Sequence, residues 1–180
     1  LFDWEKRIQK IIGVENIEYT CELKYDGASI NLTYENGILK SAVTRGDGFQ
    51  GDDVTANIKT IKSIPLVIRE SAFNTFEIRG EIILPFDGFK KMNEERIEAG
   101  EEPYRNPRNT ASGSLKLQDS AEVAKRPLDC LLYHIVESTN KFETHFNTLE
   151  EAKKLGFKIP KAIKVCKSIL NVLSSSKVKP

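Results

Sequence analysis

Residues 32–39 read LTYENGIL, and the dipeptide Asn36-Gly37 at their centre separates two short runs of strand-forming residues. This pattern is the strongest short-range sequence signal for a β-hairpin, because Asn and Gly both tolerate the positive φ angles that a two-residue turn requires. β-rich runs continue outward over residues 19–45. The sequence therefore predicts antiparallel sheet in this part of the chain.

Helices and further strands are predicted on both sides of the hairpin. Trp4, Ile8, Ile11 and Ile12 form the apolar stripe of an amphipathic helix, and Gly13 is a suitable end for it. Toward the C-terminus the patterns predict a strand over 76–84, a helix capped by Asp87 and ended by Gly100, a strand over 128–136, and a helix with a capping box at Thr148 and Glu151 ended by Gly156.

Two segments are less regular. Residues 54–61 fit either a helix or an extended segment, and residues 101–114 are predicted to form a long loop, because they are rich in Pro, Asn and Gly. Strands and helices that are mixed without βαβ units favour an α+β fold built on antiparallel sheet.

The composition is that of one ordinary globular domain over residues 1–180. The chain has 27 Lys and Arg against 26 Asp and Glu, and 39% of its residues are hydrophobic. Its three cysteines lack CxxC spacing, which argues against a zinc or disulfide scaffold and favours reduced thiols in a cytoplasm. Residues 156–180 contain six lysines and no acid, for which a solvated tail is a simpler interpretation than a nucleic-acid contact.

Lys24 lies in the motif ELKYDG, residues 22–27, between Glu22 and Asp26. A lysine amine can attack phosphorus, but only about one in a thousand is neutral near pH ~7.4 at the ordinary pKa of about 10.4. A nucleophilic lysine therefore needs burial or nearby cations. If the motif forms a strand, the three ionisable side chains share one face and line a pocket. The alternative is a surface lysine beside a turn at Asp26-Gly27.

Arg45 begins the segment RGDGFQG, residues 45–51, which contains the pattern GxGxxG. A dinucleotide-binding turn is disfavoured, because Asp47, Asp52 and Asp53 would set carboxylates against a pyrophosphate and the chain lacks βαβ units. The Arg-Gly-Asp tripeptide of cell-adhesion ligands is interpreted as coincidence. Arg45 itself can bind phosphate or ribose oxygens through its guanidinium group.

Residues 77–81 read EIRGE and place Glu77, Arg79 and Glu81 on one face of the predicted strand. Such a face suits either cross-strand ion pairs or a carboxylate that holds ribose hydroxyls or a divalent metal. The two interpretations are about equally supported by the pattern.

Residues 106–116 read NPRNTASGSLK and add the cations Arg108 and Lys116. These can supply the positive charge that a nucleophilic lysine and its phosphate target require. Tyr133 stands near the end of an apolar strand, where a half-buried packing role is the default and base stacking is the alternative.

Taken in order, these blocks resemble the adenylation domain of bacterial NAD-dependent DNA ligases, within the nucleotidyltransferase superfamily that includes ATP-dependent ligases and mRNA capping enzymes. The blocks are ELKYDG at 22–27, TRGDG at 44–48, GDDVTAN at 51–57, EIRGE at 77–81 and NPRNTASGSLK at 106–116. The similarity covers residues 1–168, and residues 169–180 form a tail unlike the family. It implies the antiparallel-sheet fold of that superfamily, truncated to part of the adenylation domain.

The resemblance implies an enzyme that seals nicks in duplex DNA during replication and repair. It further implies a bacterial cytoplasmic monomer with no membrane association, with NAD as the AMP donor and Mg²⁺ as a cofactor. Lys24 matches the catalytic nucleophile, which attacks the α-phosphate of NAD and forms a covalent lysyl-AMP. The other matches are cofactor-binding residues: Glu22 at the adenine amine, Arg45 and Glu81 at the ribose and phosphate, Asp26 as the acid of the motif, Arg108 and Lys116 for phosphate handling, and Tyr133 on the adenine ring. No residue is assigned as a metal ligand.

Two lysine-bearing blocks of that family, one resembling GVVIK and one ending in KFP, do not occur in the chain. We therefore expect a fragment that cannot ligate alone and that adenylates itself feebly or not at all. Two other hypotheses stay open at this point. One is a nucleotidyltransferase of the RNA ligase or capping type that uses ATP or GTP, and the other is a noncatalytic nucleic-acid-binding module.

Overall fold

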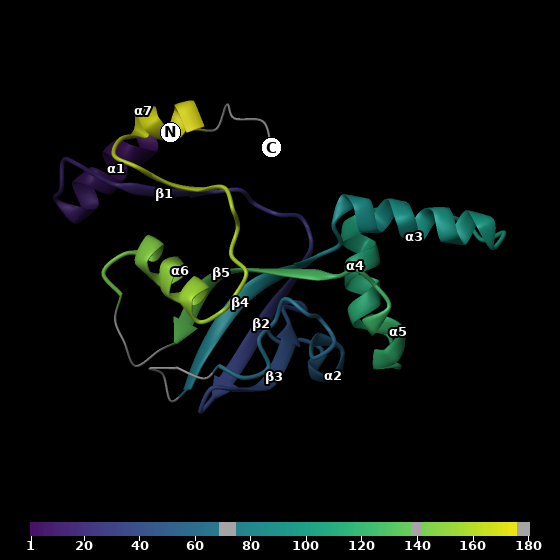
Figure 1. Ribbon diagram of the computed structural model, residues 1–180. Coiled ribbons are helices and arrows are strands. Elements are labelled where there is room, and N and C mark those ends of the chain that lie inside the picture. The colour runs from purple at the N-terminus through teal and green to yellow at the C-terminus, as the bar shows by residue number, and fades with distance from the viewer. Residues whose placement is uncertain (69–74, 138–141, 176–180) are drawn as a thin grey trace. The chain divides into compact units, whose positions relative to one another are not determined.

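The chain divides into two units of structure. The computed structural model describes residues 1–68, 75–137 and 142–175 (Figure 1). The larger unit runs from Tyr25 to Ile159, and the smaller unit combines Leu1–Lys24 with the segment that starts at Pro160. Lys177 and Lys179 of the basic C-terminal segment lie outside the described residues. Among the described helices, none has the length and hydropathy needed to cross a bilayer.

A four-stranded antiparallel sheet forms the centre of the larger unit. Its strands are β2 (Ala28–Glu35), β3 (Ile38–Thr44), β4 (Thr75–Ile83) and β5 (Asp129–Glu137), in the order β3-β2-β4-β5. The predicted hairpin joins β2 to β3, with φ angles of 50° at Asn36 and 75° at Gly37. The predicted α+β fold on antiparallel sheet is therefore confirmed.

Alternation along β2 sends one set of side chains into the core and the other set to the opposite face. Every second residue from Ile30 to Tyr34 is buried, and the polar residues between them are half-buried. The Tyr34 ring stacks on Phe76 with centroids 5.1 Å apart and meets Phe157 edge-on at 5.4 Å. The Tyr34 hydroxyl donates to the carbonyl of Pro65 at 2.7 Å, so its polar atom is satisfied inside the core.

Helices lie around this sheet. Those of the larger unit are α2 (Thr55–Ile58), α3 (Phe86–Glu98), α4 (Pro107–Leu115), α5 (Ser120–Ala124) and α6 (His145–Lys154). Helices α3, α4 and α5 gather at one end of the sheet, while α6 packs on β5 (Figure 1). The undecided segment 54–61 thus contains the short helix α2.

The prediction of a loop over residues 101–114 is wrong for the second half of that segment, where the chain forms α4. The Asn106 side chain caps this helix by accepting a hydrogen bond from the Asn109 amide at 3.1 Å. Pro107 occupies the first turn, where its missing N–H costs nothing. Asn106 and Pro107, which are residue types common in loops, therefore begin a helix here.

Two predicted helix caps are also wrong. Helix α3 begins after Pro85 without a side-chain cap, and Asp87 lies within its first turn, where a carboxylate still favours the positive end of the helix dipole. Helix α6 is capped by Thr144, whose hydroxyl accepts from the Asn147 amide at 3.1 Å, so the predicted capping-box residues lie inside the helix. Gly156, with a φ of 91°, follows its end as predicted.

Asp47 forms hydrogen bonds within the loop between β3 and α2. Its carboxylate accepts hydrogen bonds from the amides of Phe49 and Gln50, each at 2.9 Å. These bonds, with that to Gln50 the larger cause, lower the pKa of Asp47 below its ordinary value. A Cβ at Gly46 would lie 1.7 Å from the Gln50 carbonyl oxygen, so the loop closes tightly on itself. Phe49 is left 98% exposed.

The smaller unit contains the two-stranded antiparallel sheet of β1 (Tyr19–Glu22) and β6 (Ile163–Cys166), with helices α1 (Phe2–Ile12) and α7 (Ile169–Ser175). Gly13 ends α1 with a φ of 69°, as predicted. The Sγ atoms of Cys21 and Cys166 lie 3.6 Å apart, and both thiols are free. Burial, followed by the contact with Cys166, raises the pKa of Cys21.

We expect Gly37→Ala to lower the free energy of unfolding by about 1–3 kcal/mol, because alanine at a positive φ is strained. Its Cβ would also lie 2.4 Å from the Ile68 carbonyl oxygen. Urea denaturation followed by far-ultraviolet circular dichroism measures the change. Gly113→Ala is the matched control, since the residue lies inside α4 and a Cβ there would meet no atom within 4 Å other than its chain neighbours and the backbone of the helix. Gly113→Ala should raise the free energy of unfolding by about 0.5–1 kcal/mol, because alanine is the better helix former. If both variants lowered the free energy of unfolding by a similar amount, the strain at Gly37 would not be the cause.

Acidification should release the loop held by Asp47. Because the pKa of its carboxyl is lowered, the two acceptor bonds persist through the ordinary Asp titration range and are lost only as pH falls through the lowered value. The amide chemical shifts of Phe49 and Gln50 report the change by nuclear magnetic resonance. In Asp47→Asn the side-chain oxygen still accepts but does not titrate, so both shifts should stay constant with pH. A midpoint at or above the ordinary Asp pKa would refute the prediction.

Candidate functional site

Lys24 and Glu22 belong to the smaller unit, and the other predicted site residues belong to the larger one. Strand β1 ends at Glu22, so Lys24 lies in an irregular segment and its side chain is exposed. The prediction that one strand carries Glu22, Lys24 and Asp26 on a common face is therefore wrong. The backbone leaves the extended pairing at the point where its partner β6 begins, at Ile163.

Asp26 meets Arg108 directly after the lysine. Arg108 Nη1 lies 2.8 Å from Asp26 Oδ1, and the two side chains are 57% and 68% exposed. The contact joins the motif at residues 22–27 to the first turn of α4, which lies 82 residues further along the chain. An ion pair this exposed contributes only about 0–1 kcal/mol, so a competing anion can displace the carboxylate from Arg108 at little cost.

Glu81 holds the turn that follows Asp26. Its Oε1 atom accepts a hydrogen bond from the Gly27 amide at 3.1 Å. A Cβ at position 27 would lie 2.2 Å from the Ile82 carbonyl oxygen, so the backbone approach between this turn and β4 requires glycine. Asp26, Glu81 and Arg108, predicted from three separate motifs, are therefore brought together.

Glu77 and Arg79 lie on the same face of β4 as Glu81 but do not make the same contacts. The predicted alternation is confirmed, because Ile78 and Ile82 on the other face are fully buried. Glu77 accepts a hydrogen bond from Asn31 Nδ2 at 2.8 Å, and Arg79 is exposed. A contact within the sheet therefore occupies Glu77, while Glu81 reaches the turn at Gly27.

Tyr133 and Arg45 meet at Ser29, a residue that the sequence analysis did not select. The Tyr133 hydroxyl lies 3.3 Å from Ser29 Oγ, and the Arg45 amide donates to the Ser29 carbonyl at 3.3 Å. Register pairing also sets Ser29 opposite Glu81. The polar alternation of residues 29, 31 and 33 along β2 is a sequence signal that could have identified this residue.

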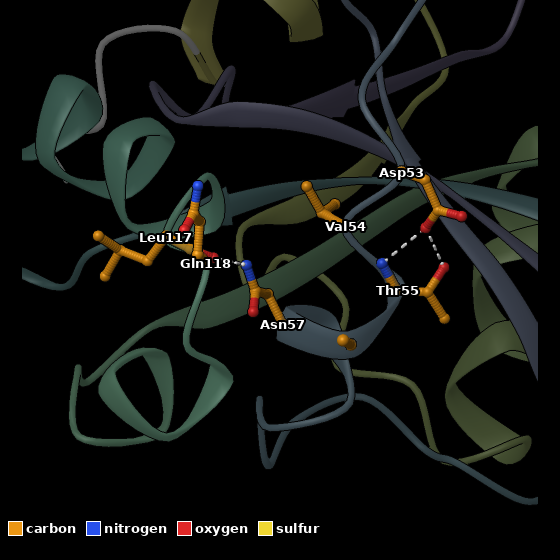
Figure 2. Close-up of a pocket in the computed structure, with 7 residues that line it drawn as sticks. Asp53, Val54, Thr55, Asn57, Leu117 and Gln118 are labelled. Atoms are coloured by element: carbon orange, nitrogen blue, oxygen red, sulfur yellow. Dashed lines mark hydrogen bonds between the residues drawn. The ribbon is translucent and has the colours of Figure 1, made fainter.

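Lys116 lies beside a pocket and forms an ion pair with Asp52 at 2.8 Å. The pocket has a volume of about 460 Å³ and is shown in Figure 2. It is lined by Asp53, Val54, Thr55, Ala56, Asn57, Leu117 and Gln118, and by none of the predicted site residues. Asn57 donates to the carbonyls of Leu115 and Leu117 at 2.7 and 2.8 Å, which ties α2 to the end of α4.

The charges of the larger unit suit a phosphorylated ligand better than a metal held by protein alone. Arg45, Arg108 and Lys116 are cations on its surface, and two of them already bind carboxylates, which are anions of similar chemistry to phosphate. Within the described residues, no group of three or more His, Cys, Asp or Glu side chains could hold a metal ion.

Comparison with known proteins gives a consistent result. A sequence profile of the NAD-dependent DNA ligase adenylation domain matches residues 1–178. The chain is 64% identical over 172 residues to a DNA ligase of Flavobacterium johnsoniae, covering 96% of this chain and 26% of that protein. It is 64% identical over 173 residues to a DNA ligase of Christiangramia forsetii, again covering 96% and 26%. Identity to a DNA ligase of Cytophaga hutchinsonii is 49% over 172 residues, covering 95% and 26%.

The chain spans 26% of the length of each of these relatives. Within that span the profile match extends over nearly every residue, and it includes the segments that carry Lys24, Asp26, Glu81 and Arg108. Fold, motif order and sequence similarity agree, and the chain belongs to the family of NAD-dependent DNA ligase adenylation domains.

Proposed function

We propose that this chain is the nucleotide-handling part of an NAD-dependent DNA ligase and that Lys24 receives AMP from NAD. The observation that carries the proposal is the junction of three motifs at the turn after the lysine. Arg108 binds Asp26 there, and Glu81 binds the Gly27 amide. Family membership supports the same conclusion, because NAD is the AMP donor for which the family is named.

Each predicted residue has a role in this proposal. Lys24 is the nucleophile, and its neutral amine attacks the α-phosphorus of NAD. A nitrogen–phosphorus bond forms, the bond to the departing nicotinamide mononucleotide phosphate breaks, and the amine loses a proton to solvent. The residues that bind the nucleotide are Glu22 and Tyr133 at the adenine, Arg45 and Glu81 at the ribose and phosphate, and Asp26, Arg108 and Lys116 at the phosphates.

The proposed role of Arg108 follows from the exposure of its ion pair. A phosphate oxygen can replace the Asp26 carboxylate without loss of a buried contact, because both side chains are more than half exposed. Guanidinium binds phosphate through paired N–H groups, which fixes orientation as well as charge. In-line displacement at phosphorus depends mainly on such positioning and charge stabilisation.

Further parts of the proposal concern the whole protein. Mg²⁺ would supply charge neutralisation at the phosphates when bound. The acceptor of AMP is the 5′-phosphate at a nick in duplex DNA, and attack by the adjacent 3′-hydroxyl completes sealing in replication and repair. We propose a cytoplasmic monomer. Charge on the larger unit alone is mixed, so the DNA contacts belong largely to the rest of the ligase.

Incubation with NAD and Mg²⁺ tests the assignment of Lys24. We expect the whole ligase that contains this sequence to gain the mass of one AMP, and the 180-residue chain alone to gain it feebly or not at all. Intact-mass spectrometry measures both. A near-stoichiometric adduct on the chain alone would refute the second expectation. ATP or GTP in place of NAD should give no adduct, and an adduct formed with either instead of NAD would assign the chain to another class of nucleotidyltransferase.

Lys24→Ala should abolish the adduct in the whole ligase, because the proposal assigns the attacking amine to Lys24 and alanine has no nucleophilic group. Lys40→Ala is the matched control: Lys40 is an exposed lysine on β3 whose ammonium lies 4.0 Å from Glu35, and its loss should leave adduct formation unchanged. Peptide mapping should place AMP on the peptide that contains Lys24. An adduct that survives in Lys24→Ala would show that the nucleophile is a different residue.

A further inference from the structure

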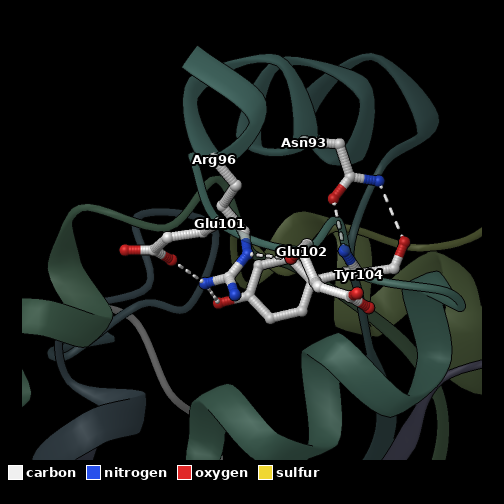
Figure 3. Close-up of polar contacts among 5 residues, drawn as sticks. All are labelled: Asn93, Arg96, Glu101, Glu102 and Tyr104. Atoms are coloured by element: carbon white, nitrogen blue, oxygen red, sulfur yellow. Dashed lines mark hydrogen bonds and ion pairs between the residues drawn. The ribbon is translucent and has the colours of Figure 1, made fainter. Parts of the chain in front are cut away.

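Side chains of α3 hold the segment between α3 and α4 (Figure 3), in addition to the backbone hydrogen bond from the Glu101 amide to the Arg96 carbonyl at 2.8 Å. Asn93 of α3 donates from Nδ2 to the Tyr104 carbonyl at 3.0 Å and accepts from the Tyr104 amide at 2.7 Å. Arg96, one turn further along α3, donates from Nε to the Glu102 carbonyl at 2.7 Å and forms an ion pair with Glu101 at 2.7 Å.

Tyr104 is the centre of these contacts. Its ring lies under the Arg96 guanidinium, 4.4 Å from Cζ to the ring centroid, and its hydroxyl lies 3.4 Å from Arg96 Nη1. A second guanidinium, that of Arg126, lies 5.8 Å from the same centroid and donates to Ser114 Oγ at 2.8 Å. Arg126 therefore contacts both Tyr104, before α4, and Ser114 in its last turn.

This arrangement fixes the start of α4. Tyr104 precedes the cap residue Asn106 by two positions, and Asn106 precedes Arg108 by two more. The Asn106 carbonyl accepts from the Thr110 amide at 3.0 Å, so the cap sets the direction of the first turn. Arg108 points from that turn to Asp26 at 2.8 Å. A displacement of Tyr104 would therefore move the guanidinium that Asp26 binds.

We propose that Asn93, Arg96 and Tyr104 form a positioning clamp that sets the start of α4 so that Arg108 reaches the turn after Lys24. This inference rests on the proposed function of Arg108 in phosphate handling and adds three residues that act through it. None of the three touches Asp26. The exposure of the Arg108–Asp26 pair makes such a clamp necessary, because a weak surface ion pair cannot order its own arginine.

The test follows Arg108 in the 180-residue chain by nuclear magnetic resonance. The Arg108 Nε–Hε resonance is assigned by its loss in Arg108→Lys, and Asp26→Ala gives its position without the ion pair. We expect Asn93→Ala and Arg96→Ala to shift the resonance toward that of Asp26→Ala. Tyr104→Phe keeps the ring under Arg96 and should leave the Arg108 resonance near its wild-type position. Lys90→Ala, on the exposed surface of the same helix, is the matched control and should not shift it.

Hydrogen exchange separates positioning from general stability. In Asn93→Ala the Asn109 and Thr110 amides should exchange about tenfold faster, because two hydrogen bonds that hold the preceding segment are lost. Amides of β4 should keep their wild-type rates. The proposal is overturned if Arg108 keeps its wild-type resonance in both clamp variants, or if β4 exchange accelerates as much as that of α4. Neither readout needs adenylation, so a failure of Lys24 to take up AMP in the whole ligase would refute the proposed function and leave this result unaffected.

Discussion

The two-residue alternation of side chains along β2 and β4 is the constraint on which the larger unit depends. One face of these strands supplies buried residues such as Leu32, Tyr34 and Ile78, and the other supplies polar groups such as Ser29 and Glu81. A shift of one residue in the pairing would exchange the two sets and place carboxylates in the core. The hairpin at residues 36–37 fixes the register of β2 against β3 and so keeps the buried face apart from the polar face.

Backbone proximity then brings distant motifs together. Pairing of β2 with β4 sets Ala28 opposite Ile82, so the turn at Gly27 lies against β4 with room only for a hydrogen atom at its Cα. That closeness lets Glu81 reach the Gly27 amide. Arg108 comes from a separate direction, at the N-terminal end of α4. One strand pairing and one helix terminus thus bring the charged groups together at this turn.

The sheet could be predicted because its sequence signals are local. The geometry of the site could not be predicted, because it depends on contacts between residues that are far apart in the sequence. Asn36-Gly37 and the stripe of α1 depend on neighbours in sequence, and both predictions are confirmed. Helix α4 was missed because Asn106 and Pro107 favour loops and helix starts alike, and only the folded chain distinguishes the two. The irregular course of the backbone at Lys24 reflects where β1 loses its partner, which no pattern in residues 22–27 records. The roles assigned to the site residues remain predictions.

The position of the single tryptophan determines what optical measurements can report. Trp4 lies on α1 in the smaller unit, 41% exposed, with its ring 5.8 Å from that of Tyr19. The aromatic cluster around Tyr34 belongs to the larger unit and contains no indole. Intrinsic fluorescence excited at the indole band therefore follows the melting of only one of the two units, and a single transition seen by this signal says nothing about the cooperativity of the whole chain.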